Sequence, residues 1–273
     1  MNRLTIYLSS LLFGAFVFSC QQTAKDTPVA NSDNEIPAAV TAQVKKLGFS
    51  TENMKRIPEG YLVEGDIILD EEALEHSHGK QEHFLRVGSE EQYRTSALVG
   101  GLPRTITISL SSSLPSVYTS AVDELIRRYN NEGLQVRFSR VSSGGAIQFG
   151  AAPSGSEYLA SAGFPSNGNP YNRVLVNVSY LGSSSGTTRV NYLATIFAHE
   201  VGHCIGFRHT DYYNRAISCG GAASNEGSSG IGAILIPGTP SSADLSSWML
   251  ACVGNNQNRP FTTNDRTALR YLY

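Results

Sequence analysis

The stretch HEVGHCIGFRH, residues 199–209, carries three histidines and one glutamate at a spacing that suits a single metal ion. In a helix, residues four apart lie on one face, about 6 Å apart along the axis, so His199 and His203 can bind the same ion. A helix that continued would place His209 about 9 Å beyond His203, too far away to share it. Gly206 removes this obstacle, because glycine adopts the left-handed conformations that end helices. We therefore predict a helix that stops near Gly206 and a sharp turn that brings His209 back to the ion.

Glu200 indicates what such an ion would do. Three protein ligands leave the fourth position of a tetrahedral zinc ion open, which is typical of catalytic rather than structural zinc sites. Glu200 directly follows the first histidine, where its carboxylate can reach a water molecule at that position. Zinc lowers the pKa of water towards neutrality, and Glu200 can then act as general base. The alternative is a surface helix that carries histidines by chance, but three of the six histidines of the chain fill this pattern.

The residues around the motif resemble a known family. H-E-x-x-H-x-x-G-x-x-H followed by a methionine turn is the signature of the metzincin metallopeptidases. The longer run HEVGHCIGFRHTDYYNR is most similar to the bacterial dual-action HEIGH metallopeptidases, relatives of the astacins, and the similarity covers roughly residues 100–273. It implies a zinc endopeptidase with one catalytic Zn2+, and no motif supports an additional calcium ion. It also implies that Glu200 is the general base and that the zinc ligands are His199, His203 and His209.

Met249 is the candidate for the methionine turn. The run Ser247-Trp248-Met249 resembles the Ser-x-Met turn of the family. The alternative is a core methionine that fills a gap in the packing, which is the usual use of methionine. Astacins place a tyrosine two residues after this methionine, whereas this chain has Ala251 there. The sequence therefore assigns no tyrosine that stabilises the transition state, neither Tyr212 nor Tyr213.

Apolar and polar residues alternate from Arg104 onward in a way that predicts an α+β domain. The expected elements are a strand over 105–110, a helix over 116–131, strands over 135–141, 146–149 and 173–180, the active-site helix over 191–205 and a last helix over 264–271 capped by Thr263. This order matches the upper subdomain of metzincins. The resemblance implies a twisted, mostly parallel sheet with an antiparallel edge strand, where an extended peptide typically adds to the sheet. It also implies a C-terminal subdomain with the Met-turn and the final helix.

Residues 1–19 resemble a signal peptide, because Arg3 supplies positive charge and residues 4–18 are apolar. Ser19-Cys20 resembles a bacterial lipobox, in which Cys20 is lipidated and becomes the mature N-terminus. An ordinary secretory signal that is cleaved nearby is the alternative. Both place the protein outside the cytoplasm, at the cell envelope or outer surface as a lipoprotein, or otherwise secreted. No second apolar run of about 20 residues predicts a membrane-spanning helix.

The chain after this leader divides into a flexible polar tether over 20–40, a prosegment-like region over 41–98 and the catalytic domain over 99–273. In the second of these, Val63-Glu64-Gly65-Asp66 resembles the Phe-x-Gly-Asp motif of astacin prosegments, whose aspartate caps the zinc. The resemblance implies that Asp66 keeps a zymogen inactive. The alternative is a Gly-Asp turn in a hairpin, a common use of those residues.

The cysteines predict one covalent link. Beyond Cys20, the chain holds three cysteines, an odd number, and in an oxidising compartment this predicts one disulfide and one buried thiol. The pairing among Cys204, Cys219 and Cys252 stays open. Cys204 lies off the histidine face of its helix, so we do not expect it to bind zinc. Because no cysteine lies between Cys20 and Cys204, a cysteine-switch prosegment is excluded.

A second group of histidines lies within EHSHGKQEH. His76, His78 and His83 could bind metal, since H-x-H spacing suits an extended strand. Such a charged cluster is more often a solvated face of the protein.

Charge and composition indicate which classes of partner the protein binds. The net charge is −2 and no basic run or aromatic stripe is present, so nothing indicates a nucleic-acid partner. We expect protein or peptide substrates, membrane contact only through an N-terminal lipid, and a monomer. One rival function is a zinc hydrolase that acts on a non-peptide amide or ester. Another is a non-catalytic surface lipoprotein that binds a partner and keeps zinc for structure, although such a site has no need of Glu200.

Overall fold

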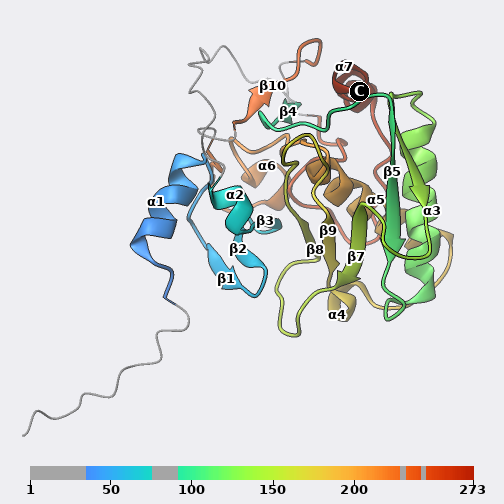
Figure 1. The fold of residues 1–273 in the computed structure, drawn as a ribbon, viewed down its shortest axis with the longest axis horizontal. Coiled ribbons are helices and arrows are strands. Elements are labelled where there is room, and N and C mark those ends of the chain that lie inside the picture. Colours follow the sequence, from blue (N-terminus) through green and yellow to red (C-terminus); the bar gives the residue numbers. More distant parts are fainter. Residues whose placement is uncertain (1–34, 76–91, 228–231, 241–243) are drawn as a thin grey trace, which may run out of the picture. The chain divides into compact units, whose positions relative to one another are not determined.

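An eight-stranded mixed sheet runs through the molecule in the order β1-β2-β3-β8-β9-β7-β5-β6 (Figure 1). Strands β9, β7, β5 and β6 are parallel to one another, and β8 is antiparallel to β9. The predicted α+β class, with a mostly parallel catalytic sheet, is confirmed. The strands are β1 (Lys55–Ile57), β2 (Gly60–Val63), β3 (Ile67–Leu69), β5 (Arg104–Leu110), β6 (Val136–Arg140), β7 (Ile147–Ala151), β8 (Ala160–Ala162) and β9 (Arg173–Val176).

This computed structural model describes residues 35–75, 92–227, 232–240 and 244–273. Residues 36–273 fold as one compact unit. The predicted signal peptide with Cys20 and the histidines at positions 76, 78 and 83 lie outside the described residues. In the part of the chain that is described, no helix has the length and apolar character needed to cross a membrane.

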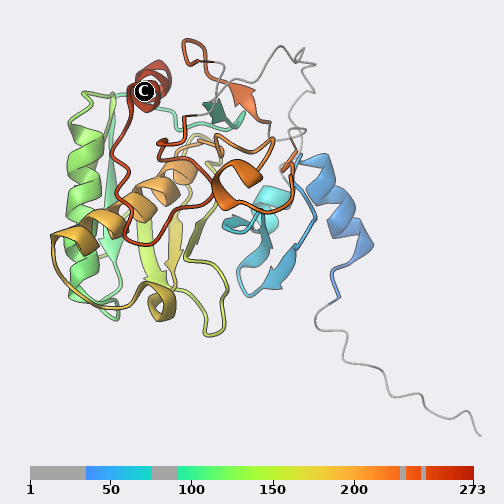
Figure 2. The ribbon, with the colours of Figure 1, turned by 180° about the vertical axis from the view of Figure 1, so that it is seen from behind.

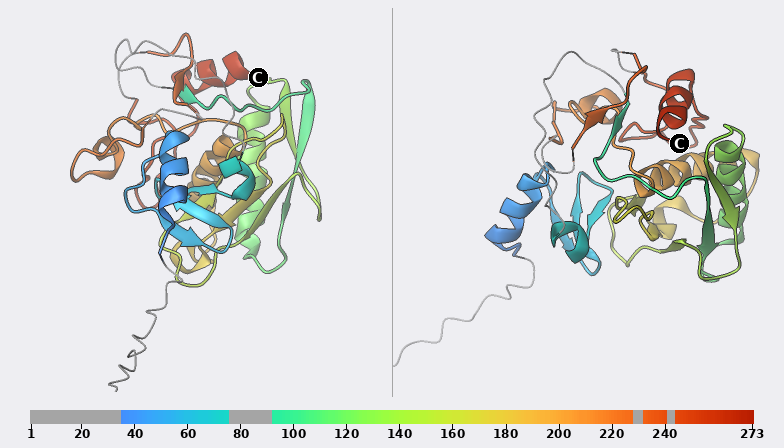
Figure 3. Two further views of the ribbon diagram at one scale, coloured as in Figure 1. Left: turned by 60° about the vertical axis from the view of Figure 1, so that its left-hand side comes forward. Right: turned by 45° about the horizontal axis from the view of Figure 1, so that its top comes forward.

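Two long helices, α3 (Ser116–Asn130) and α5 (Thr187–Cys204), lie side by side on one face of the parallel strands (Figure 2, Figure 3). Tyr118 of α3 contacts Phe197 of α5 with ring centroids 5.4 Å apart, and Phe197 contacts Phe149 of β7 at 5.2 Å. All three rings are buried. Because burial of a phenylalanine side chain contributes about 1.5–3 kcal/mol, this cluster fixes α5 against the sheet.

The predicted strand over 173–180 is too long. β9 ends at Val176, and Asn177 caps a short helix, α4 (Val178–Leu181). The side-chain oxygen of Asn177 accepts hydrogen bonds from the backbone N–H groups of Ser179 and Tyr180. Asparagine is among the favoured N-cap residues, and here the cap outweighs the apolar run that favoured a strand.

The last helix, α7 (Thr263–Leu272), is present, but its cap is Thr262 and not Thr263. The Thr262 hydroxyl accepts a hydrogen bond from the Asp265 backbone N–H, and the Asp265 carboxylate accepts one from the Thr262 N–H. This reciprocal pair is a capping box built with an aspartate. The active-site helix α5 likewise begins at Thr187, before the predicted residue 191.

The residues that precede the catalytic domain extend the sheet. Helix α1 (Ala38–Lys46) begins inside the predicted tether, so residues 38–40 are helical. Strands β1, β2 and β3 form an antiparallel meander followed by α2 (Glu71–Glu75). β3 then pairs in parallel with β8, and the Ala162 N–H donates to the Asp66 carbonyl at 3.0 Å. β8 is the antiparallel strand implied at the edge of the catalytic sheet, and β3 covers its outer side.

In the part of the chain that follows α5, a disulfide joins Cys219 to Cys252. Cys204 is buried and unbridged. The prediction of one disulfide and one buried thiol is confirmed, and the structure supplies the pairing. The short elements of this part are α6 (Ala216–Cys219) and β10 (Ile234–Leu235), which pairs with β4 (Tyr93–Arg94).

Candidate metal centre

The chain bends sharply where the sequence predicts. Helix α5 ends at Cys204, and Gly206 has a φ of 109°, a conformation that disfavours any residue with a side chain. A Cβ atom at Gly206 would also lie 2.7 Å from the Ala97 carbonyl oxygen. The Phe207 N–H donates to the Gly202 carbonyl and closes the turn. The bend reverses the chain and carries His209 back towards the helix.

Three imidazole nitrogens converge at this bend. Nε2 of His203 lies 3.1 Å from Nε2 of His199 and 3.2 Å from Nε2 of His209, and the remaining pair is 3.3 Å apart. Two nitrogens held about 2.0–2.1 Å from a zinc ion at tetrahedral angles would lie about 3.3–3.4 Å apart. The spacing of the three nitrogens therefore matches one shared tetrahedral centre.

The other nitrogen of each ring has an acceptor of its own. Nδ1 of His199 lies 2.9 Å from the Trp248 carbonyl oxygen, and Nδ1 of His203 lies 2.8 Å from the Phe207 carbonyl oxygen. Because a carbonyl can only accept, these Nδ1 atoms carry the proton and each Nε2 lone pair faces the centre. In their neutral forms the three rings would direct three Nε2 lone pairs to one buried point, where a cation would offset their mutual repulsion, so these residues fit a zinc ion.

Burial favours the neutral form of the central ring. His203 is fully buried. Burial, together with the neighbouring His199 and His209, lowers the pKa of His203 well below its usual value. A metal ion binds the neutral imidazole, so His203 is in the form that could bind a metal at neutral pH.

His209 is oriented by a carboxylate that the sequence analysis missed. Its Nδ1 lies 2.9 and 3.0 Å from the two carboxylate oxygens of Glu226, which is buried. A carboxylate behind a metal-binding histidine fixes the ring and raises its basicity. Glu226 lies in an irregular segment with no periodic pattern, so nothing in the local sequence marks it.

Asp66 reaches the same centre from the N-terminal segment. Its Oδ2 lies 3.1 Å from Nε2 of His209 and 3.5 Å from Nε2 of His199. The turn that presents it joins β2 to β3 and contains Gly65 with a φ of 92°. Burial alone would raise the pKa of Asp66, but the three histidines hold it well below its usual value. Asp66 is thus both a hairpin-turn residue and a fourth potential ligand beside the three histidines.

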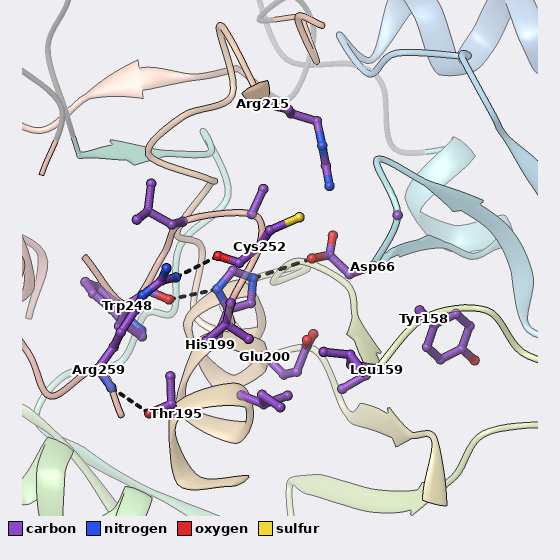
Figure 4. Close-up of a pocket in the computed structure, with 16 residues that line it drawn as sticks. Asp66, Tyr158, Leu159, Thr195, His199, Glu200, Arg215, Trp248, Cys252 and Arg259 are labelled. Atoms are coloured by element: carbon purple, nitrogen blue, oxygen red, sulfur yellow. Dashed lines mark hydrogen bonds and ion pairs between the residues drawn. The ribbon is translucent and has the colours of Figure 1, made fainter. Parts of the chain in front are cut away.

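Glu200 lies beside the histidines on α5 and is 2% exposed. Its Oε2 atom has no hydrogen-bond partner among the described residues. Burial, and then the nearby Asp66, raise the pKa of Glu200 well above its usual value. Glu200, His199 and Asp66 line one cavity of about 210 Å3 (Figure 4). The Glu200 side chain therefore lines a space where a reacting group can enter.

Met249 packs directly against the metal-site helix. It is fully buried, and a Cβ atom at Gly202 would lie 2.5 Å from its sulfur. The Met249 carbonyl accepts a hydrogen bond from the Thr210 N–H at 2.9 Å, next to His209. The turn around Met249 thus contacts α5 between two of the histidines and holds the returning chain.

The turn is anchored to the C-terminal helix through Asp265. Its carboxylate accepts hydrogen bonds from the Ser247 hydroxyl at 2.8 Å and from the Trp248 N–H at 3.3 Å. Gln92 donates to the same carboxylate at 2.6 Å. The sequence analysis missed Asp265, although its place three residues after a threonine is a capping signal.

Two arginines, the buried Arg208 and the half-buried Arg215, tie the N-terminal segment to the site. Nη2 of Arg208 donates to Oε2 of Glu64 at 2.8 Å, and both side chains are inaccessible to solvent. The guanidinium of Arg208 also lies over the ring of Phe49, 4.8 Å from its centroid. Arg215 donates to the Glu64 carbonyl and to the Glu226 carboxylate. The buried ion pair between Arg208 and Glu64, which is two residues before Asp66, therefore holds the N-terminal segment in place.

The match to a family decides the class of protein. Residues 62–273 match the family described as dual-action HEIGH metallo-peptidase. The chain belongs to this family. It is therefore a metallopeptidase, and the resemblance noted in the sequence is confirmed. No curated protein is similar enough in sequence to count as a match.

Solved structures of peptidases resemble the chain at a distance. One structure of myroilysin is 16% identical, covers 65% of this chain and 96% of its own, and has a TM-score of 0.41. A second myroilysin structure is 15% identical, covers 63% of this chain and 83% of its own, and has a TM-score of 0.39. High choriolytic enzyme 1, a hatching-enzyme zinc protease from the medaka fish Oryzias latipes, is 15% identical, covers 38% of this chain and 44% of its own, and has a TM-score of 0.26.

Proposed function

We propose that this HEIGH metallopeptidase is a zinc endopeptidase in which His199, His203 and His209 bind the metal. The observation that carries the proposal is the convergence of three Nε2 atoms at tetrahedral spacing beside an unpaired, buried carboxylate. When bound, zinc acts as a Lewis acid that lowers the pKa of water and polarises the scissile carbonyl.

Glu200 is the proposed general base and acid. A carboxylate is most effective in this role when its pKa is close to the working pH, and burial shifts Glu200 in that direction. Its free Oε2 would take a proton from the attacking water and deliver it to the nitrogen of the leaving amine. The accessible cavity beside this atom gives the substrate room to approach.

β8 is the proposed binding strand for an extended peptide. Its outer side makes backbone hydrogen bonds, as the bond between the Ala162 N–H and the Asp66 carbonyl demonstrates. A peptide that replaced β3 could add to the sheet at the same place. This strand addition favours a peptide substrate over a small amide or ester, for which no edge strand would be needed.

The N-terminal segment is the proposed inhibitor of the same site. Asp66 lies where a fourth ligand would bind, and β3 occupies the outer side of β8. Both features must leave before an extended peptide can enter. We propose that residues 41–98 are a prosegment, that 99–273 is the catalytic domain, and that the chain is made as a zymogen.

The proposed location is outside the cytoplasm. It rests on the signal-like residues 1–19 and on Cys20, followed by a tether to residue 40. Intact-mass measurement for a lipid on Cys20 and N-terminal sequencing of the active form would test the anchor and the processing site together. A mature chain that began at the tether without lipid would support the ordinary secretory alternative.

The decisive experiment separates metal binding from catalysis. Glu200→Ala should retain zinc in elemental analysis and lose nearly all cleavage of casein or gelatin, whereas His203→Ala should lose the metal. Both variants are measured with and without Asp66→Ala, so that latency does not hide activity. Full activity in Glu200→Ala would defeat the assignment. Cleavage of a small ester without cleavage of any peptide would support the non-peptide hydrolase instead.

A further inference from the structure

The cavity beside Glu200 extends between two walls (Figure 4). One wall is the side of α5 that carries Thr195, Ile196 and His199. The other is the segment 250–253, directly after Met249, and this segment is fixed by the Cys219–Cys252 disulfide. Most of the lining side chains are apolar, and two arginines, Arg215 and Arg259, are among them.

Arg259 is buried without a partner for its charge. The residue is 8% exposed, and its Nε atom has no hydrogen-bond partner among the described residues. One guanidinium nitrogen donates to the Cys252 carbonyl at 2.8 Å. In the described part of the chain, no carboxylate lies within ion-pair distance of this side chain. A buried cation in this state is costly, because the more distant carboxylates of Asp211 and Asp265 offset its desolvation only in part.

Three other arginines, of which Arg208 and Arg128 are buried and Arg215 is half-buried, differ in this respect. Arg208 binds Glu64, Arg215 binds Glu226 and Arg128 binds Glu124. The pKa values reflect the contrast. Burial lowers the pKa of Arg259, and Asp211 and Asp265 only partly oppose this. For Arg215, Glu226 and Asp66 more than offset the effect of burial, so that its pKa is raised. Of these four arginines, Arg259 is thus the one that lines the cavity without a carboxylate within ion-pair distance.

We propose that Arg259 forms the base of a substrate pocket that binds an acidic side chain next to the scissile bond. The inference rests on the proposed peptidase function and adds a substrate class to it. The methylene groups of a bound aspartate or glutamate would pack between Ile196 and Leu250, which are both buried, and its carboxylate would accept hydrogen bonds from the free guanidinium donors. Arginine suits this role because its planar donors match a carboxylate.

The pocket is held in shape before a ligand arrives. The backbone N–H of Arg259 donates to the Thr195 hydroxyl at 2.9 Å, and that hydroxyl in turn donates to the Asn191 carbonyl. The bond from the guanidinium to Cys252 joins Arg259 to the disulfide-linked wall. A binding group fixed in this way costs little conformational entropy when the substrate binds.

The competing view is that Arg259 only braces the segment 250–253 through its bond to Cys252. A brace would affect stability and all substrates alike. A recognition group would affect acidic substrates selectively. The two views therefore differ in which ratio of rates changes.

The test uses the zinc-loaded full-length chain, with and without the Asp66→Ala substitution. The substrates are pairs of peptides. The two peptides of a pair are identical except that one has Asp and the other Asn, or one has Glu and the other Gln, at one position around the cleaved bond. At one position we expect the wild type to favour the acid by at least about tenfold in kcat/KM, as a charge-assisted hydrogen bond provides. Arg259→Met should abolish the preference, so that the acid and amide peptides of each pair have equal kcat/KM. Arg259→Lys should keep part of it, and Arg270→Met, an exposed arginine on α7, should behave as wild type.

Each outcome has a distinct meaning. Cleavage by the wild type with equal rates for acid and amide peptides overturns the pocket and leaves the peptidase function intact, even if Arg259→Met fails to fold. A preference that survives in Arg259→Met also overturns it. No cleavage of any peptide by the zinc-loaded wild type or its Asp66→Ala form would instead contradict the proposed function.

Discussion

Glu226 lies 2.9 Å from Nδ1 of His209 and gives this histidine a carboxylate partner, whereas His199 and His203 face backbone carbonyls. A carboxylate stabilises the ring more strongly than a carbonyl does, because the hydrogen bond is charge-assisted. His209, the proposed zinc ligand that lies outside the helix, thus has the most strongly hydrogen-bonded Nδ1 atom of the three histidines.

Glu226→Gln should therefore weaken zinc binding. Loss of an outer partner of this kind typically lowers metal affinity about 10–100-fold. Competition with a chromogenic chelator measures the change. Glu132→Gln, which alters a carboxylate that pairs with Arg266 and Arg270, is the matched control and should leave the affinity unchanged. Equal affinities for all three proteins would show that Glu226 does not orient the ligand.

Asp66→Ala should activate the full-length chain. The contact between the Asp66 carboxylate and the histidine cluster is charge-assisted, and such a bond contributes about 1.5–3 kcal/mol. Its loss should raise the fraction of molecules in which the N-terminal segment has left the site. The initial rate of cleavage of a labelled peptide should rise with that fraction, about ten- to hundredfold. Asp123→Asn changes an aspartate that forms a surface ion pair with Arg140 and should not alter the rate. An unchanged rate in Asp66→Ala would argue that the aspartate is only a turn residue.

Glu64→Gln should loosen the N-terminal segment. It leaves Arg208 buried without its nearest carboxylate, and disruption of a buried pair costs about 3–5 kcal/mol. The Ala162 amide, which binds the Asp66 carbonyl, is a direct probe, and its hydrogen exchange should accelerate about a hundredfold or more.

Glu157→Gln is the control for this comparison. Its partner Lys55 also belongs to the N-terminal segment, but the pair is solvent-exposed. Exposed pairs contribute little, so exchange at Ala162 should stay near the wild-type rate. If both variants accelerated exchange equally, the buried pair would have no special part in holding the segment.

Gly206→Ala should damage both stability and metal binding. A residue with a side chain is strained at a φ of 109°, at a cost of about 1–3 kcal/mol, and its Cβ would also collide with the Ala97 carbonyl. Relief of the collision requires the bend to move, and His209 moves with it.

Gly133→Ala separates the two effects. Gly133 also has a positive φ, of 70°, but a Cβ atom there meets nothing within 4 Å. We expect thermal unfolding to report a loss of stability in both variants, larger for Gly206→Ala, and zinc affinity to fall in Gly206→Ala alone. Normal zinc affinity in Gly206→Ala would mean that the bend does not need glycine to position His209.

Features that depend on nearby residues could be predicted from the sequence. The spacing of His199 and His203 follows from the pitch of one helix. Gly206 predicts the bend because glycine adopts a positive φ with little strain. The strands and helices of the catalytic domain were predictable for the same reason, since their apolar periods are local. The errors occurred at their ends, where a single capping residue such as Asn177 decides.

Features that join distant segments were decided by the tertiary structure. Asp66 meets His209 across 143 residues, and Cys219 pairs with Cys252 rather than Cys204 because the fold buries Cys204 elsewhere. Glu226 and Arg259 lie in stretches without regular periodicity, so no pattern marks them. Their roles depend on which side chains the fold brings together and on which charges it leaves without a partner. Neither can be predicted from the neighbouring residues in the sequence.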